Sequence, residues 1–378
     1  MPFFSAPWGR PFRHLLPLAL SALAAGPALG QVVSPTPVYP PPVPSPADTT
    51  AAGTIDRQEF ATPSVVGMGP SRGLIFHYER MPTFKVDSDA RVVGLSDYSA
   101  NAEKNARLVI KGYIPMLNNP HLKLILGVNY EREEFQFRGS PTNYELYDNL
   151  ENKGLKTIGT QLAVIRPVNA VNWYIFRVKG ELSGDYTSRE LNVADYLRVS
   201  AEFLYGWKRS PTFSWGVGVQ LGYTFGRLSP YPAVLYNRTF NSRWGVEAIF
   251  PARVTARYNV SPRSLLFAGY TVDGFNYIVK LRTPLVRQGQ TDKVALQTLE
   301  LRETEVKLRG RWEREIYDFL WFGVEGGYRY NYAFDAFDRT NADREKIIDS
   351  NLAWAPYLSL ELFIVPPRKL LNKLNDQR

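Results

Sequence analysis

Residues 213–225 have the sequence FSWGVGVQLGYTF, and this stretch decides the expected fold. Every second residue is large and apolar, and the residues between are small or polar, which is typical of a β-strand with one apolar face. The run exceeds the mean soluble strand of about 5 to 6 residues and suits a tilted bilayer crossing of about 9 to 11. The apolar positions are Phe213, Trp215, Val217, Val219, Leu221, Tyr223 and Phe225.

The same alternation recurs along the chain, with charges between large apolar residues. This pattern favours a polar lumen and a lipid-facing exterior over a soluble sandwich, which would bury its apolar face and need only shorter strands. We therefore predict an all-β fold, a transmembrane antiparallel β-barrel of about twelve strands. They are expected near residues 72–82, 104–116, 121–137, 154–166, 173–184, 196–208, 213–226, 242–258, 264–278, 298–313, 319–334 and 351–365.

The connections between these strands alternate in length. Short ones contain turn-forming residues, at 117–120, 167–169, 208–211, 259–262 and 315–318. Longer loops are expected at 83–103, 138–153 and 335–350. Short periplasmic turns opposite long extracellular loops are typical of outer-membrane barrels, and aromatic residues gather near both sets of connections. The pattern predicts the cell outer membrane as the location, with both termini in the periplasm.

The N-terminal residues predict export. Arg10 and Arg13 precede an apolar run, and Ala28-Leu29-Gly30 supplies small residues for cleavage. We expect a signal peptide at 1–30, a proline-rich periplasmic linker at 31–68, the barrel at 69–365 and a basic periplasmic tail at 366–378. A mean hydropathy of −0.25 argues against a helical membrane protein.

Two segments carry a resemblance to a known group of proteins. They are YNVSPRS at residues 258–264 and LWFGVEGGYR at 320–329. Over about residues 72–365 the chain resembles the uncharacterised outer-membrane β-barrel families of the Bacteroidota, described only as domains of unknown function. The resemblance implies a barrel in the outer membrane of a Gram-negative bacterium. It implies no catalytic residue.

Charge and cysteine content exclude several functions. The chain has no cysteine, which excludes disulfides and thiolate chemistry. Its formal net charge is +9, and loss of residues 1–30 with Arg10 and Arg13 leaves +7. Because an exported chain seldom meets nucleic acid, we expect none as a partner and assign the excess to the lumen wall or to lipopolysaccharide.

The sequence offers little for catalysis. His77 and His121 lack the partners of a nucleophilic site, and we interpret both as structural. Paired acids such as Glu303 and Glu305 are followed by Lys307 on the same face, so ion pairing is the simpler account. Acidic residues in the long loops are expected to be solvated. We therefore predict no catalytic, cofactor or metal residue, and no enzyme.

The leading functional hypothesis is a porin-like channel for small solutes, with a plugged structural barrel close behind. An outer-membrane enzyme acting on lipid or peptide is the alternative, and a soluble secreted binding protein comes third. Expected partners are outer-membrane lipid, lipopolysaccharide and the barrel-assembly machinery. The residues expected to line the lumen are Arg177, Lys179, Arg198, Glu202, Arg253, Arg257, Glu305, Lys307, Arg309, Arg311, Glu325 and Arg329.

Overall fold

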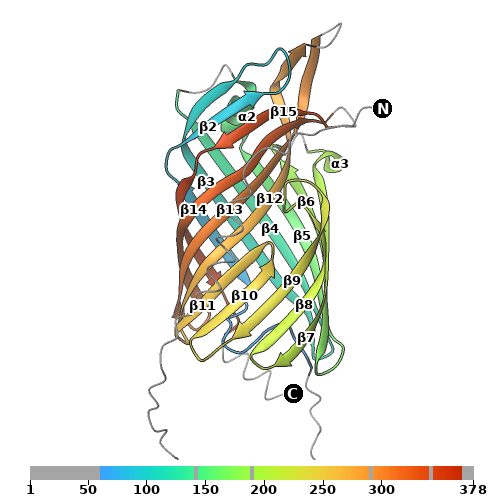
Figure 1. The fold of residues 1–378 in the computed structure, drawn as a ribbon, viewed down its shortest axis with the longest axis vertical. Coiled ribbons are helices and arrows are strands. Elements are labelled where there is room, and N and C mark those ends of the chain that lie inside the picture. Colours follow the sequence, from blue (N-terminus) through green and yellow to red (C-terminus); the bar gives the residue numbers. More distant parts are fainter. Residues whose placement is uncertain (1–59, 140–143, 188–190, 289–292, 340–343, 368–378) are drawn as a thin grey trace, which may run out of the picture. The chain divides into compact units, whose positions relative to one another are not determined.

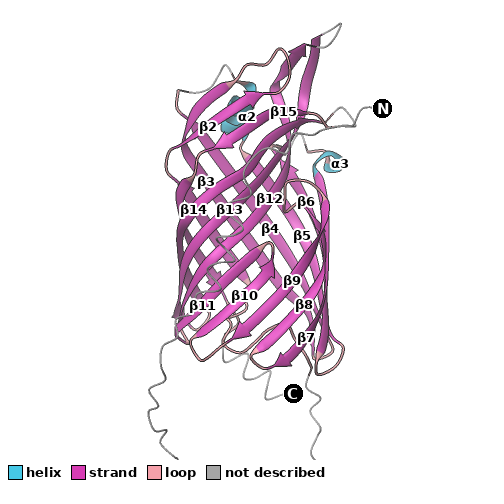
Figure 2. Ribbon diagram, viewed as in Figure 1, coloured by secondary structure: helices cyan, strands magenta, loops and turns pink. Residues whose placement is uncertain are grey.

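The computed structural model describes residues 60–139, 144–187, 191–288, 293–339 and 344–367, so the predicted signal peptide, residues 31–59 of the linker and the tail from 368 lie outside it. Strands make up nearly all of its regular structure (Figures 1 and 2). Two short helices, α2 (Glu145–Lys153) and α3 (Val193–Tyr196), follow β4 and β6. Neither has the length and apolar character of a membrane-crossing helix. The strands are β1 (Leu74–Met81), β2 (Phe84–Ala90), β3 (Tyr98–Asn119), β4 (Leu122–Phe137), β5 (Leu155–Pro167), β6 (Asn172–Gly184), β7 (Leu197–Ser210), β8 (Phe213–Gly222), β9 (Ser229–Thr239), β10 (Trp244–Phe250), β11 (Arg253–Ser261), β12 (Ser264–Gln288), β13 (Lys293–Tyr317), β14 (Leu320–Asp338), β15 (Lys346–Leu352) and β16 (Ala355–Ile364).

All sixteen strands belong to one sheet that closes on itself. The seam is the antiparallel pair β1–β16, which runs from Leu74 opposite Ile364 to Arg80 opposite Leu358. On its other side β1 pairs with β3, and β16 pairs with β14. Beyond the seam, β2 and β15 continue the wall between β3 and β14. Closure leaves no free strand edge at the seam, which is what a bilayer requires of a spanning sheet.

The sixteen strands correct the expected count of about twelve. β2 and β15 lie in segments expected to be loops, since Pro82 and the pair Ala353-Trp354 separate them from β1 and β16. β9 was missed because Pro230 and Pro232 weaken the strand signal. The expected strand at 242–258 is a hairpin, β10 and β11, turned at Pro251 and Ala252. A two-residue turn preserves the alternation, so the period of two does not reveal it.

The outer face of the ring is apolar. Val219 on β8 and Leu360 on β16 are 55% and 52% exposed, although water-soluble proteins rarely expose large contiguous apolar surface. A closed ring with this exterior is the architecture of an integral outer-membrane β-barrel. Large exposed apolar side chains on the wall strands include Phe76, Tyr78, Leu108, Ile114, Val128, Ile158, Leu162, Phe176, Val199, Phe203, Val217, Leu308, Leu358 and Leu362.

A helix closes the loop end of the ring, where α2 follows β4 (Figure 1). Leu146, Tyr147 and Leu150 of α2 are fully buried in the largest apolar core, which also contains side chains from β2, β4, β12, β13, β14 and β15. Gly154 ends the helix at a φ of 62°, and a Cβ there would lie 2.7 Å from the carbonyl oxygen of Glu133. We call α2 and this core the roof.

Residues 60–73 cross the opposite, turn end of the ring and form what we call the floor. The Ala61 N–H donates to the carbonyl of Asn169 in the β5–β6 turn at 3.0 Å. Farther along, the Asn237 amide on β9 donates to the carbonyl of Pro63 at 2.9 Å. Ala61 is buried with Trp173 and Leu204, whose side chains point into the ring. The part of the expected linker that is described is therefore packed against the barrel wall.

Candidate functional site

A chamber lies inside the ring between the roof and the floor. Its volume is about 610 Å³, and its lining comes from β1, β3 to β8 and β10 to β14, with Arg72 of the floor and Glu361 of β16. Ten of the lining side chains are Lys or Arg and seven are Asp or Glu, so cations exceed acids. This excess of cations gives the chamber wall a net positive formal charge.

A layer of buried charges separates the chamber from the roof. Arg107 on β3 donates to Glu133 on β4 at 2.9 Å and to Glu305 on β13 at 2.6 Å. The Lys307 ammonium is 2.8 Å from both carboxylate oxygens of Glu79 and 3.1 Å from Glu305. These contacts connect strands on different sides of the ring. We call this set the charge layer, and its members are Glu79, Arg107, Glu133, Glu303, Glu305, Lys307 and Arg329.

Aromatic rings of the roof lie directly against the charge layer. The guanidinium of Arg107 lies 4.6 Å from the ring centre of Phe275, and that of Arg329 lies 5.4 Å from the ring of Phe84. Buried cations placed over aromatic faces gain electrostatic stabilisation in addition to their ion pairs. The roof and the charge layer are therefore in direct contact at the loop end.

A second group of ion pairs joins the floor to the wall. Arg72 donates to Glu361 at 2.6 Å and also to Glu313. Arg311 forms ion pairs with the same two acids, and Arg309 pairs with Glu325 at 3.0 Å. One end of the floor is thus fixed to β13 and β16 by charge as well as by packing.

Two cations in the chamber belong neither to the charge layer nor to the ion pairs of the floor. Lys111 on β3 and Arg253 on β11 line the cavity, and neither forms an ion pair with any residue that the structure describes. Arg198 also lines it, and donates to the amide oxygen of Asn276 at 2.6 Å rather than to a carboxylate. These side chains remain available to an anionic group in the chamber.

The residues expected to line the lumen fall into three places. Arg177, Lys179, Arg198, Glu202, Arg253, Lys307, Arg309, Arg311 and Glu325 line the chamber. Glu305 and Arg329 lie in the charge layer, to which Lys307 also belongs. Arg257 is fully buried beside the floor, 3.0 Å from Glu247, and it donates to Thr239 at 2.9 Å.

Several features of the site escaped the sequence analysis. Arg72 precedes the first strand, so no alternation assigns it to a face. Asp273 lies on β12 and Glu131 on β4, and both line the chamber. The alternation of polar and apolar residues along these two strands could have assigned both acids to the lumen face. The acidic residues Asp335 and Asp338 were expected to be solvated, but both are buried, and Asp335 pairs with Lys346 at 2.7 Å; Asp343 lies outside the described residues.

The roof also was not predicted. Residues 138–153 were expected to form a solvated loop, because three acids obscure the apolar positions Leu146, Tyr147 and Leu150. Burial raises the pKa of the Tyr147 phenol above its usual range, so its hydroxyl stays neutral in the roof. Leu146 and Leu150, spaced by four residues, were the available signal of a helix with one apolar side.

Among the described residues, no three His, Asp or Glu side chains are placed to hold a metal ion. His77 contacts Glu361 through Nδ1 at 3.3 Å and lies 3.8 Å from Glu79. These are contacts within the charged wall of the chamber.

Comparison with known proteins places the chain in a family. The family model described as Domain of unknown function (DUF6268) matches residues 140–363. The chain belongs to this family. Within the barrel it covers the segment from the roof to the last strand. No curated protein matches the sequence of the chain.

Several solved outer-membrane proteins resemble the chain at low similarity. A FadL homologue of Pseudomonas aeruginosa is 10% identical, with a TM-score of 0.37 over 78% of this chain and 90% of that one. An outer membrane channel from Pseudomonas putida F1 is 12% identical, with a TM-score of 0.35 over 79% and 97%. The outer membrane protease OmpT from Escherichia coli is 6% identical, with a TM-score of 0.28 over 80% and 100%. Similarity at this level does not separate a channel from a protease.

Proposed function

We propose that this protein is a gated outer-membrane channel whose chamber takes small anionic solutes. The observation that supports this best is the cavity of about 610 Å³ inside the ring, lined by more cations than acids. Lys111 and Arg253 supply positive charge that no ion pair with a described residue neutralises. An excess of lining cations raises the local concentration of anions and favours their passage.

Passage through the ring requires the roof to move. The apolar core around α2 closes the loop end above the charge layer. α2 is a short helix in the β4–β5 connection, so it can leave the ring without breaking a wall strand. The proposed gate is therefore α2, with Gly154 at the position where the chain changes direction.

A plugged structural barrel is the second candidate, and the ion pairing supports it. Arg177 pairs with Glu202 at 2.7 Å and Lys179 with Glu181 at 2.7 Å, so these lining charges neutralise each other. A barrel that never opens needs no free cation in its lumen. The difference between the two candidates is whether removal of the roof creates a selective pore.

Planar-bilayer recording tests this difference. One protein is the full chain, and the other has Glu145–Lys153 replaced by a short Gly-Ser linker. We expect low conductance from the first and stable conductance from the second, with a reversal potential in a salt gradient that favours chloride. The bias will be modest, because salt screens charge over about 10 Å at 0.1 M.

The source of selectivity is tested with two matched pairs of substitutions. Lys111→Gln with Arg253→Gln in the protein without α2 is expected to shift the reversal potential toward cations. Arg166→Gln with Arg314→Gln removes the same charge from exposed positions near the turn end, and no shift is expected. If the protein without α2 folds correctly but does not conduct, the plugged barrel is the function that remains.

We also propose that the protein is not an enzyme. The absence of a nucleophile, base and acid grouping from the sequence motifs supports this. Incubation of the purified protein with phospholipid, lipopolysaccharide and peptides tests it, and turnover of any of these would favour the enzyme alternative. The origin in the Bacteroidota, which the resemblance of residues 258–264 and 320–329 implies, stays a prediction.

A further inference from the structure

The charges of the charge layer do not balance. The layer has three cations and four acids, and all seven side chains are buried. A buried carboxylate that no cation compensates is costly, and such a group takes up a proton instead of staying ionised. The layer therefore has one acid more than its cations neutralise. The cations are Arg107, Lys307 and Arg329, and the acids are Glu79, Glu133, Glu303 and Glu305.

Neighbouring groups do not supply a fourth cation. The ion pairs that join the floor to the wall contain three cations and three acids, so that group is neutral by itself. Glu131 and Lys111, which line the chamber, add one acid and one cation. His77 lies 3.8 Å from Glu79 and adds a positive charge only when it is protonated. The members of the neutral group are Arg72, Arg309, Arg311, Glu313, Glu325 and Glu361.

Glu303 is the acid with the weakest compensation. Among the described residues, its one ion-pair contact is with Nη2 of Arg107, at 3.8 Å. Glu133 and Glu305 lie closer to the same guanidinium, at 2.9 and 2.6 Å. One carboxylate oxygen of Glu303 accepts from the Asn331 amide at 2.7 Å, and the other has no hydrogen-bond partner in the part of the chain that is described. Glu303 therefore loses the least ion pairing when it becomes neutral.

The surroundings of Glu303 disfavour a negative charge. In the sheet it lies between Phe275 on β12 and Phe334 on β14, and both rings pack in the core of the roof. Acids that share a buried site do not all ionise together, because like charges at short range repel each other. The charged and titratable groups that face Glu303 are Arg107 on β3, Glu133 on β4, Tyr277 on β12, Glu305 on β13 and Arg329 on β14.

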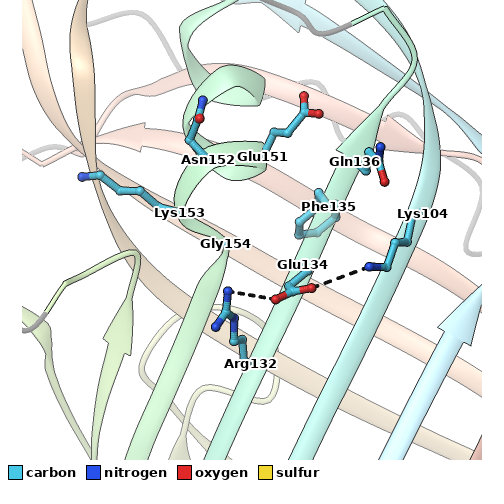
Figure 3. A pocket seen from close by; sticks show the side chains of 9 residues that line it. All are labelled: Lys104, Arg132, Glu134, Phe135, Gln136, Glu151, Asn152, Lys153 and Gly154. Carbon is cyan, nitrogen blue, oxygen red and sulfur yellow. Dashed lines mark ion pairs between the residues drawn. The ribbon is translucent and has the colours of Figure 1, made fainter.

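The charge layer lies near the polar end of the wall. The outward-facing neighbours of Glu133 on β4 are Arg132 and Glu134, an ion pair at 2.8 Å (Figure 3). Beside them, a hollow of about 320 Å³ among β3, β4 and α2 is lined by both acids and cations. Charged side chains on the outer face mark the end of the apolar exterior. The layer is therefore close to water at the loop end, with which a proton can exchange.

We infer that the charge layer binds one proton at neutral pH and that Glu303 carries it. With the proton in place, three acids remain for three cations, and the layer has no net charge. Loss of the proton at alkaline pH leaves an unbalanced negative charge against the aromatic rings of the roof. Alkaline pH therefore weakens the contact between the roof and the charge layer. That this weakening opens a channel rests on the proposed function.

Urea unfolding of the detergent-solubilised full chain, followed by tryptophan fluorescence from about pH 5 to about pH 9, tests this site. An unfolded glutamate releases its proton near its ordinary pKa of about 4.3, whereas the folded barrel keeps the proton on Glu303. The folded state then binds one proton more than the unfolded state, so this site increases the unfolding equilibrium constant up to about tenfold for each pH unit. Stability is therefore lost at this site as the pH rises.

Glu303→Gln replaces the protonated acid with a neutral side chain of the same shape. We expect this variant to have a higher urea midpoint than wild type at about pH 8, and a smaller fall of the midpoint with pH. Glu305→Gln is the matched control, because it lies two residues away on the same strand face and removes an ionised partner of Arg107 and Lys307. We expect the control to have a lower midpoint than wild type at neutral and alkaline pH.

Two outcomes of the unfolding experiment would overturn the assignment. Equal losses in Glu303→Gln and Glu305→Gln would show that Glu303 is ionised. Loss of the pH dependence in His77→Gln rather than in Glu303→Gln would place the proton on the imidazole. Different mobility of unboiled and boiled samples on a gel verifies that each variant is a folded barrel.

Infrared spectra of the wild-type barrel give a second measurement, which does not depend on the folding of a variant. Exposed acids are already ionised at about pH 7. A carbonyl band of a protonated carboxylic acid that persists at this pH and disappears at alkaline pH is therefore expected from Glu303. Absence of the band at neutral pH would contradict the bound proton. Its persistence in folded Glu303→Gln would assign it to another acid and overturn the role of Glu303.

Planar-bilayer recording of the full chain tests the link to the roof. We expect a larger open fraction at about pH 9 than at about pH 6 in wild type, and no such change in Glu303→Gln. A chain that conducts equally at both pH values would overturn this link. A chain that never conducts would contradict the proposed channel, whereas the proton site is decided by the unfolding and infrared measurements alone.

Discussion

The Arg107 guanidinium donates through Nη1 to Oε1 of Glu305 at 2.6 Å, and this bond joins β3 to β13 across the inside of the ring. The two strands are not neighbours in the sheet, so backbone pairing does not hold them together here. Arg107 also donates to Glu133, and all three side chains are buried. The charge layer therefore stabilises the ring through ion pairs across its interior.

Removal of Arg107 tests how much these ion pairs contribute to the free energy of unfolding. Arg107→Gln leaves Glu133 and Glu305 without their principal cation, and breaking a buried ion pair on one side costs about 3 to 5 kcal/mol. Urea unfolding in detergent, followed by tryptophan fluorescence, measures the change. The control is Lys85→Gln, which removes an exposed partner of Asp87 and should cost less than about 1 kcal/mol. Equal costs for the two variants would contradict a bracing role.

Gly206 is expected to tolerate no side chain. The indole of Trp173 lies against it inside the ring, donating from its ring nitrogen to Ser214 at 3.1 Å, and a Cβ at Gly206 would overlap the indole. Gly206→Ala should destabilise the barrel by about 1 to 3 kcal/mol through overpacking. Gly310→Ala is the control, because a Cβ there has no neighbour within 4 Å. The unfolding assay compares both, and a tolerated Gly206→Ala would show that Trp173 moves freely.

The two faces of β8 are expected to differ in their response to charge. Val219 is 55% exposed on the apolar exterior, whereas its neighbour Gln220 lines the chamber. Val219→Arg should cost roughly 2 to 4 kcal/mol near the middle of the bilayer, and Gln220→Arg much less. Refolding equilibria in lipid vesicles measure both. A larger cost for Gln220→Arg would reverse the assignment of inside and outside.

The orientation in the membrane is testable because the chain has no cysteine of its own. Asn152→Cys places a thiol on α2 at the loop end, and Asn119→Cys places one at the end of β3, beside the β3–β4 turn. With loops outside the cell, a membrane-impermeant maleimide should label only Asn152→Cys in intact cells. Lysed cells supply the control in which both thiols react. Labelling of Asn119→Cys alone in intact cells would invert the topology.

The alternation in residues 213–225 was sufficient to predict a barrel, because one strand face meets lipid and the other meets the lumen. The fold class follows from that local property and is confirmed. The turn at Pro251 and Ala252 could not be predicted from the alternation, because a two-residue turn leaves the alternation intact on both sides. Local periodicity identifies which residues face lipid and which face the lumen, but it does not give the number of strands.

The side-chain contacts inside the ring could not be predicted from a local sequence pattern. Glu305 could be assigned to a face with Lys307, but its bond to Arg107 depends on the tilt and register of every strand between β3 and β13. The roof likewise depends on contacts between α2 and strands far away in sequence, such as β12 and β13. Such contacts are set by the closed ring as a whole, so a short window of sequence does not contain them.

The floor has a consequence for the order in which the molecule is built. Residues 60–73 lead directly into β1, and the Gly73 N–H donates to the carbonyl of Ile364 at the end of β16. Their other partners are spread over the chain, from Asn169 to Glu361. Closing loops of this length is the slow part of forming a sheet with distant pairings. The segment that the ribosome makes first among the described residues therefore has its full set of partners only after the last strand, β16, has been made.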